Sequence, residues 1–134
     1  MSKKLLSFLA IALLAGVFLA NAMAKEEKLV FICHPGLNYS EAEVTYAFKA
    51  YLDEPRPVDN RRLFSAMLKH IGYTEEKYKR IWAKMYFRRA LFTPKMMESD
   101  KEVIDWVANS YGGLGYVSEA PRGNAAVEVC GTTK

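Results

Sequence analysis

Ala108-Asn109-Ser110-Tyr111-Gly112-Gly113-Leu114-Gly115-Tyr116-Val117 is the stretch that decides how this chain folds, because a helical pattern ends in it and a strand begins. Gly112 or Gly113 can adopt the left-handed backbone conformation that closes a helix at little steric cost. The apolar residues 114–117 predict a buried strand. Within that strand, Gly115 marks a place where another part of the chain comes close.

Four helices are expected before this strand, and each begins at a capping residue. Ser40 and Ser99 each precede a glutamate by three residues, which is the capping-box pattern. Asp59 or Asn60 can cap the second helix and Thr74 the third. The third helix has the clearest apolar stripe, spaced i, i+3, i+4, i+7 and i+8, which predicts a face packed on a core. The stripe consists of Tyr78, Ile81, Trp82, Met85 and Tyr86.

Strands are expected at both ends of the domain. Residues 28–33 form a run rich in β-forming residues, which predicts a strand buried on both faces, as in a parallel sheet. Residues 125–130 predict the last strand, next to the first. The fold class is therefore α/β, with a small sheet flanked by about four helices. Cys33 and Cys130 end these strands, and we expect a disulfide between them. The alternative is two inert buried thiols.

The N-terminus has the pattern of a cleavable signal peptide. Lys3 and Lys4 precede the apolar segment Leu5–Ala20, and Ala22-Met23-Ala24 supplies the small residues that signal peptidase requires. An apolar segment of about sixteen residues is short for a membrane span. We therefore expect residues 1–24 to be removed. Residues 25–134 would then form one exported, periplasmic domain with no stable membrane anchor.

Charge and composition argue against several classes of function. Of 19 basic and 15 acidic residues, two lysines lie in the signal peptide, which leaves a net charge of +2 and no argument for nucleic-acid binding. The only histidines are His34 and His70, and neither belongs to a catalytic or metal-binding motif. We expect no enzyme activity, no metal and no cofactor.

Several segments, in order and at similar spacing, resemble the phosphate-binding proteins of ABC importers, which belong to the type 2 periplasmic binding-protein superfamily. The resemblance runs from about Leu29 to Val117 and covers one lobe of a two-lobed family. It implies a single-lobe domain of that fold and a phosphate-like oxyanion as ligand. The partner would be an ABC permease or a second protein lobe. The matching segments are Tyr46-Ala47-Phe48, Pro57-Val58, Phe64, Ile81-Trp82, Phe87, residues 99–103 and the Gly113–Val117 strand.

The residues available to hold an oxyanion lie at two expected helix starts. In the family, backbone N–H groups, hydroxyls and an arginine hold the anion between the lobes, and helix N-termini suit this role. Here Asn38 and Ser40 precede the first helix, and Asn60, Arg61 and Arg62 precede the second. The same residues can instead be plain helix caps and solvated surface. The Ser-Gly-Thr element of the family is absent before the second helix.

Two functions therefore remain open. The first is an exported solute-binding protein that captures phosphate or a related oxyanion in connection with ABC transport. The second is a periplasmic accessory or interaction protein that has kept the fold and lost the ligand site. The missing Ser-Gly-Thr element favours the second, and a calorimetric titration with oxyanions distinguishes the two.

Overall fold

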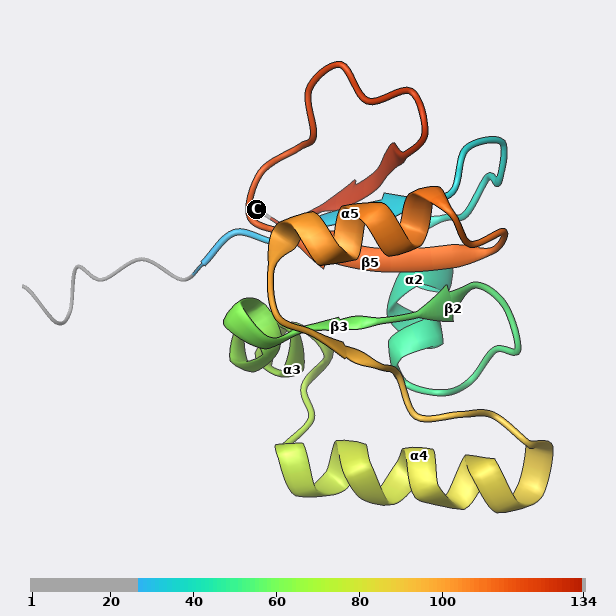
Figure 1. Ribbon diagram of the computed structural model, residues 1–134. Helices are drawn as coiled ribbons and strands as arrows, with labels where there is room; N and C mark the ends of the chain where they lie inside the picture. The colour runs from blue at the N-terminus through green and yellow to red at the C-terminus, as the bar shows by residue number, and fades with distance from the viewer. Residues whose placement is uncertain (1–26, 134) are drawn as a thin grey trace, which may run out of the picture.

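The computed structural model describes residues 27–133, so the predicted signal peptide, residues 1–24, lies outside the described residues. Within this range the chain is a mixed α/β fold, with a four-stranded sheet and a separate pair of short strands (Figure 1). The elements in chain order are β1 (Val30–Cys33), α2 (Glu41–Phe48), β2 (Arg56–Pro57), β3 (Asp59–Asn60), the 3-10 helix η1 (Arg61–Leu63), α3 (Phe64–Ile71), α4 (Glu75–Arg89), β4 (Met96–Met97), α5 (Asp100–Ala108), β5 (Gly113–Val117) and β6 (Glu128–Thr132).

The first strand lies inside the four-stranded sheet, whose order is β2-β5-β1-β6. Strand β1 pairs antiparallel with both β5 and β6, and only β2 runs parallel to its neighbour β5. The expected adjacency of the first and last strands is thus confirmed. The expectation of parallel neighbours for β1 was wrong, because burial on both faces depends on what covers a sheet and not on strand direction.

Helices cover both faces of the sheet, which explains the continuous apolar sequence of β1. Successive side chains of a strand point to opposite faces. Phe31 and Cys33 belong to the larger core cluster, with buried side chains of α2, α3 and α4, whereas Val30 and Ile32 pack with valines of α5. In Figure 1, α5 lies on one side of β5, and α4 forms an outer layer at the bottom of the molecule. No helix within residues 27–133 is long and apolar enough to cross a membrane.

The glycines of the α5–β5 junction have the roles predicted for them. Gly112 has a φ of +75°, the left-handed conformation that ends the helical segment. Gly115 faces α5 so closely that a Cβ atom would collide with Val103 and would lie 3.3 Å from Val107. The strand therefore packs against α5 backbone to side chain, which only glycine at position 115 permits.

The predicted disulfide between Cys33 and Cys130 is present, with the two Cα atoms 5.9 Å apart. Ile32 pairs with Val129 and Phe31 with Gly131, so Cys130 is the extra residue of a β-bulge in β6. The bond joins residues 97 positions apart and ties the last strand to the first.

The helix starts match the predictions more closely than the helix ends. Ser40, Thr74 and Ser99 each accept a hydrogen bond from the backbone three residues on. The box at Ser99 is incomplete, because Glu102 accepts from the backbone N–H of Glu98 instead (2.7 Å). Helix α4 continues to Arg89, beyond the expected stripe.

Candidate functional site

The two residues predicted at the start of the first helix have separate environments. Asn38 is exposed in the loop before α2. The Ser40 hydroxyl accepts from the backbone N–H of Glu43 (3.1 Å), and the Ser40 backbone N–H donates to the Glu43 carboxylate (3.1 Å). Both groups that Ser40 could offer an anion are therefore used in a complete capping box.

Asn60 is fully buried and serves the interior. Its amide nitrogen donates to Asp100 Oδ1 (2.7 Å) and to the Tyr116 carbonyl oxygen (3.0 Å), and its amide oxygen accepts from the Arg62 backbone N–H (3.2 Å). These bonds connect β3 to α5, to β5 and to the 3-10 helix. Asn60 is thus a cap, one of the two roles considered, and its amide is not open to a ligand.

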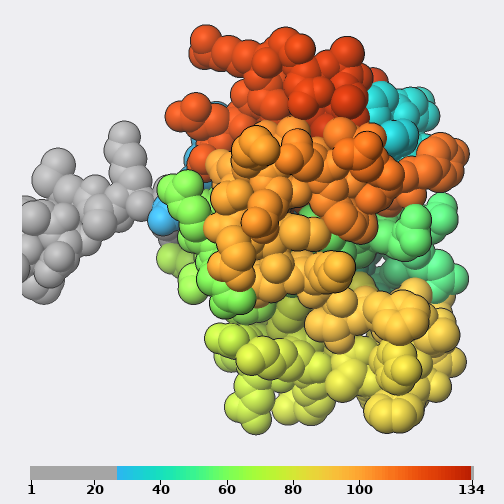
Figure 2. All heavy atoms as spheres, in the orientation of Figure 1, coloured from blue at the N-terminus to red at the C-terminus, as the bar shows by residue number. Residues whose placement is uncertain are grey.

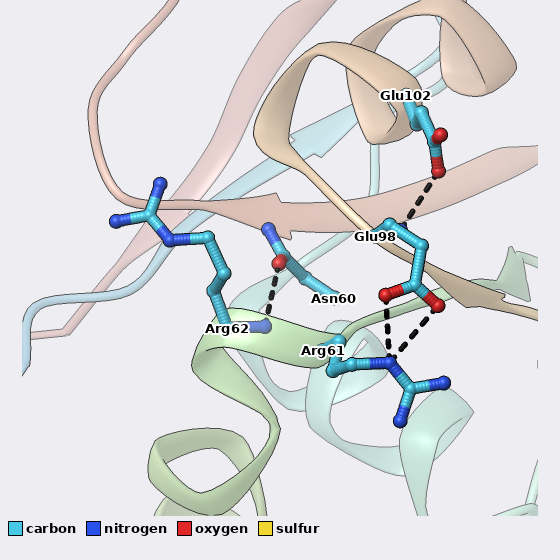
Figure 3. Close-up of polar contacts among 5 residues, drawn as sticks. All are labelled: Asn60, Arg61, Arg62, Glu98 and Glu102. Carbon is cyan, nitrogen blue, oxygen red and sulfur yellow. Dashed lines mark hydrogen bonds and ion pairs between the residues drawn. The ribbon is translucent and has the colours of Figure 1, made fainter.

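The two arginines do not form one cationic fork. Arg61 Nε donates to both carboxylate oxygens of Glu98 (2.9 and 2.8 Å). Figure 3 shows the Arg61 and Arg62 side chains pointing in different directions from the start of η1, with Asn60 between their backbones and α5. The Arg62 side chain lines an open depression of about 1130 Å³, together with Glu41, Lys69 and His70. Of the five predicted residues, Arg62 alone lines this depression.

Asp59, which the sequence placed as a helix cap, is the most unusual polar residue of the described chain. It is 1% exposed and accepts hydrogen bonds from the hydroxyls of Tyr78 (2.7 Å) and Tyr116 (2.9 Å). Burial raises the pKa of the Asp59 carboxyl to about 7, although the two hydrogen bonds act in the opposite direction. Burial, together with the nearby Asp59 charge, also raises the pKa of each tyrosine.

The cluster around Asp59 joins four elements and continues into a second carboxylate. Asp100 accepts from the Ser118 backbone N–H (3.1 Å), from the Ser118 hydroxyl (2.5 Å) and from Asn60. Burial alone would raise the pKa of Asp100, but these hydrogen bonds and the charge of Arg62 hold it below its ordinary value. The partners of Asp59 lie 19 and 57 positions along the chain, so no local motif could reveal the cluster.

The outer face of α4 differs from these sites because its side chains face solvent. Phe87 and Phe92 are 86% and 76% exposed, and Tyr86, expected in the core stripe, is 48% exposed. The Tyr86 ring contacts both phenylalanine rings, with centroid separations of 5.5 Å in each case. We call these three residues the aromatic cluster.

Basic side chains surround the aromatic cluster. Residues 75–95 carry seven basic and two acidic side chains, a formal charge of +5, whereas the other described residues carry eight basic and twelve acidic, a formal charge of −4. Arg80, Lys84 and Arg88 are exposed and form no ion pair with any residue of the described range. The available sequence signal was this run of cations, which had been interpreted only as a helix C-terminal charge cluster.

Comparison with known proteins gives no relative: no family model, curated protein or solved structure matches this chain.

Proposed function

We propose that this chain is an exported periplasmic accessory protein that acts by surface contact and does not capture an oxyanion. One observation carries the proposal. The groups predicted to hold an oxyanion are already occupied by carboxylates of the chain itself. Glu43 takes the Ser40 backbone N–H, Asp100 takes the Asn60 amide and Glu98 takes the Arg61 guanidinium.

An incoming oxyanion would have to displace these carboxylates and would be repelled by them. Displacing the Asn60–Asp100 bond would also leave buried polar atoms without partners, at a cost of about 1–3 kcal/mol each. A lobe that resembles a phosphate-binding domain but has filled its own anion donors is suited to contact with another surface.

The oxyanion function keeps one observation in its favour, the depression lined by Arg62, Lys69 and His70. The same depression is also lined by Glu27 and Glu41, which lower its positive potential. In this alternative, Arg62 would bind the anion and an ABC permease or a second lobe would close over it.

Isothermal titration of the mature, disulfide-bonded protein with phosphate, sulfate and arsenate tests the proposal. We expect no binding heat at millimolar concentration. Heat that disappears in Arg62→Ala, with a loss of about ten- to a hundred-fold in affinity, would establish the oxyanion function instead. Arg61→Ala is the matched control, because Arg61 is paired with Glu98 and does not line the depression.

A further inference from the structure

The outer face of α4 combines exposed rings and cations on one side of a helix. A helix turns about 100° per residue, so residues three, four and seven apart share a face. Arg80, Lys84 and Phe87 have this spacing, and all three point away from the side on which Tyr78 and Trp82 are buried. The helix thus presents cations along its length and the aromatic cluster at its C-terminal end.

The shape of this face excludes a narrow ligand site. The two depressions of the described surface contain no residue of α4. Figure 2 shows α4 and the segment after it, in yellow-green to yellow, as the lower margin of the molecule. Phe87 and Phe92 are therefore projecting side chains and not the lining of a pocket.

The charge of this face specifies a negatively charged partner. Its +5 contrasts with the −4 on the rest of the described chain, so a negative surface would orient the molecule with α4 toward it. Aromatic rings with nearby lysine and arginine are suited to the boundary between lipid headgroups and acyl chains, where rings are partly buried and cations meet lipid phosphates. An acidic protein groove would instead need to enclose projecting rings.

We propose that the outer face of α4 binds the surface of an anionic lipid bilayer, with the aromatic cluster inserted at headgroup depth and Arg80, Lys84 and Arg88 on lipid phosphates. This inference rests on the proposed function, because it names the surface that the accessory protein contacts. Binding is peripheral, reversible and weakened by salt, since a few charges and rings supply it.

Co-sedimentation of the processed, disulfide-bonded protein with vesicles tests the proposal. Vesicles of phosphatidylcholine containing about 30% phosphatidylglycerol should bind the protein at least tenfold better than phosphatidylcholine alone. Mass spectrometry must first show that the N-terminus is processed, because the apolar Leu5–Ala20 segment would bind lipid by itself.

Two variants separate rings from charges. Phe87→Ser with Phe92→Ser should lower binding to anionic vesicles about tenfold or more, through lost apolar burial. Arg80→Gln with Lys84→Gln and Arg88→Gln should remove the preference for anionic lipid. The matched controls are Tyr111→Ser, another exposed aromatic, and Arg122→Gln, an exposed cation in the loop before β6, and both should bind within about twofold of wild type.

Three outcomes would overturn the lipid proposal. They are equal binding to both vesicle types, equal losses in the control variants, and binding to polyglutamate but not to vesicles with the same dependence on Phe87 and Phe92. These results leave the calorimetric test of oxyanion binding untouched. Failure of the lipid inference is therefore distinguishable from failure of the proposed function.

Discussion

The region around Asp59 and the outer face of α4 use polar and aromatic side chains in opposite ways. Around Asp59, two tyrosine hydroxyls and an asparagine amide point inward, and no buried side-chain nitrogen or oxygen of the described residues lacks a hydrogen-bond partner. On α4, three cations have no ion-pair partner within the described range, and Phe87 is 86% exposed. The first region holds elements together, whereas the second is available to a partner.

This difference shows why residue type alone is a poor guide to function here. Asn60 and Arg61 have the chemistry of an anion site, but the fold brings Asp100 and Glu98 to them. Phe87 and Arg88 lie in no recognisable motif, yet the fold leaves them unpaired on the surface. A functional assignment therefore depends on which groups remain available after folding.

Loss of the disulfide should have the largest effect on the internally bonded region. Cys33→Ala with Cys130→Ala should lower the free energy of unfolding by roughly 4–5 kcal/mol, because the bond closes a loop of 97 residues in the unfolded chain. Urea unfolding of both proteins measures this change. The wild-type protein under reducing conditions is the control and should show the same loss. A difference below about 1 kcal/mol would mean that the sheet holds β6 without the bond.

The buried carboxyl of Asp59 should make stability depend on pH. Its pKa is about 7 in the folded protein against an ordinary value of 3.8, so the folded state keeps a proton that the unfolded state releases. The free energy of unfolding should therefore fall as pH rises from about 4 to 7, by roughly 4 kcal/mol from this group, and level off above that range.

Asp59→Asn should remove this contribution, because an amide does not titrate in the range. Urea unfolding measured from pH 4 to 8 checks the slope, and Asp105→Asn, at an exposed aspartate, should retain it. Identical slopes in wild type and Asp59→Asn would show that Asp59 is ionised throughout.

The two neighbouring residues of the predicted anion site should differ in their importance for stability. Asn60→Ala leaves the buried Tyr116 carbonyl without its donor and should cost about 1–3 kcal/mol. Arg61→Ala removes an exposed ion pair with Glu98 and should cost about 0–1 kcal/mol. Thermal unfolding of the two variants provides the comparison, and equal losses would argue against the internal role of Asn60.

The smallest effect on stability is expected on α4. Phe87→Ala should change the free energy of unfolding by no more than about 0.5 kcal/mol, because the ring is already in solvent. The same substitution at Phe48, which is fully buried, should cost about 3–5 kcal/mol. A large loss at Phe87 would indicate that its ring supports the fold and is not reserved for a partner.

The sequence was most informative where structure is determined locally. Helix caps at Ser40, Thr74 and Ser99 and the turn at Gly112 depend on contacts within a few residues, and their positions were predicted correctly. The disulfide was predictable because each cysteine follows a strand pattern at one end of the domain. By contrast, β3 and β4 are two residues each and have no periodicity to detect.

The sites were less predictable because they depend on residues far apart in the chain. Asp59 and Asn60 looked like caps, and nothing near them indicates that Tyr78, Asp100 and Tyr116 converge there. Tyr86 fits the helical stripe of core residues, but the end of α4 extends past what covers it and leaves the ring exposed. Periodicity identifies a face of a helix and not how far the neighbouring elements reach.

The bond between the first and last strands also determines how the molecule responds to mechanical force. Val30 pairs with Thr132 near the two described ends, and the Thr133 backbone N–H donates to the Leu29 carbonyl oxygen (3.0 Å). Pulling on both ends would unzip these pairs one after another until tension reached Cys33 and Cys130. Beyond that point the covalent bond carries the load, and the chain between the two cysteines feels no tension. The oxidised domain would then lengthen by only a few residues at each end, at roughly 3.3–3.6 Å per residue.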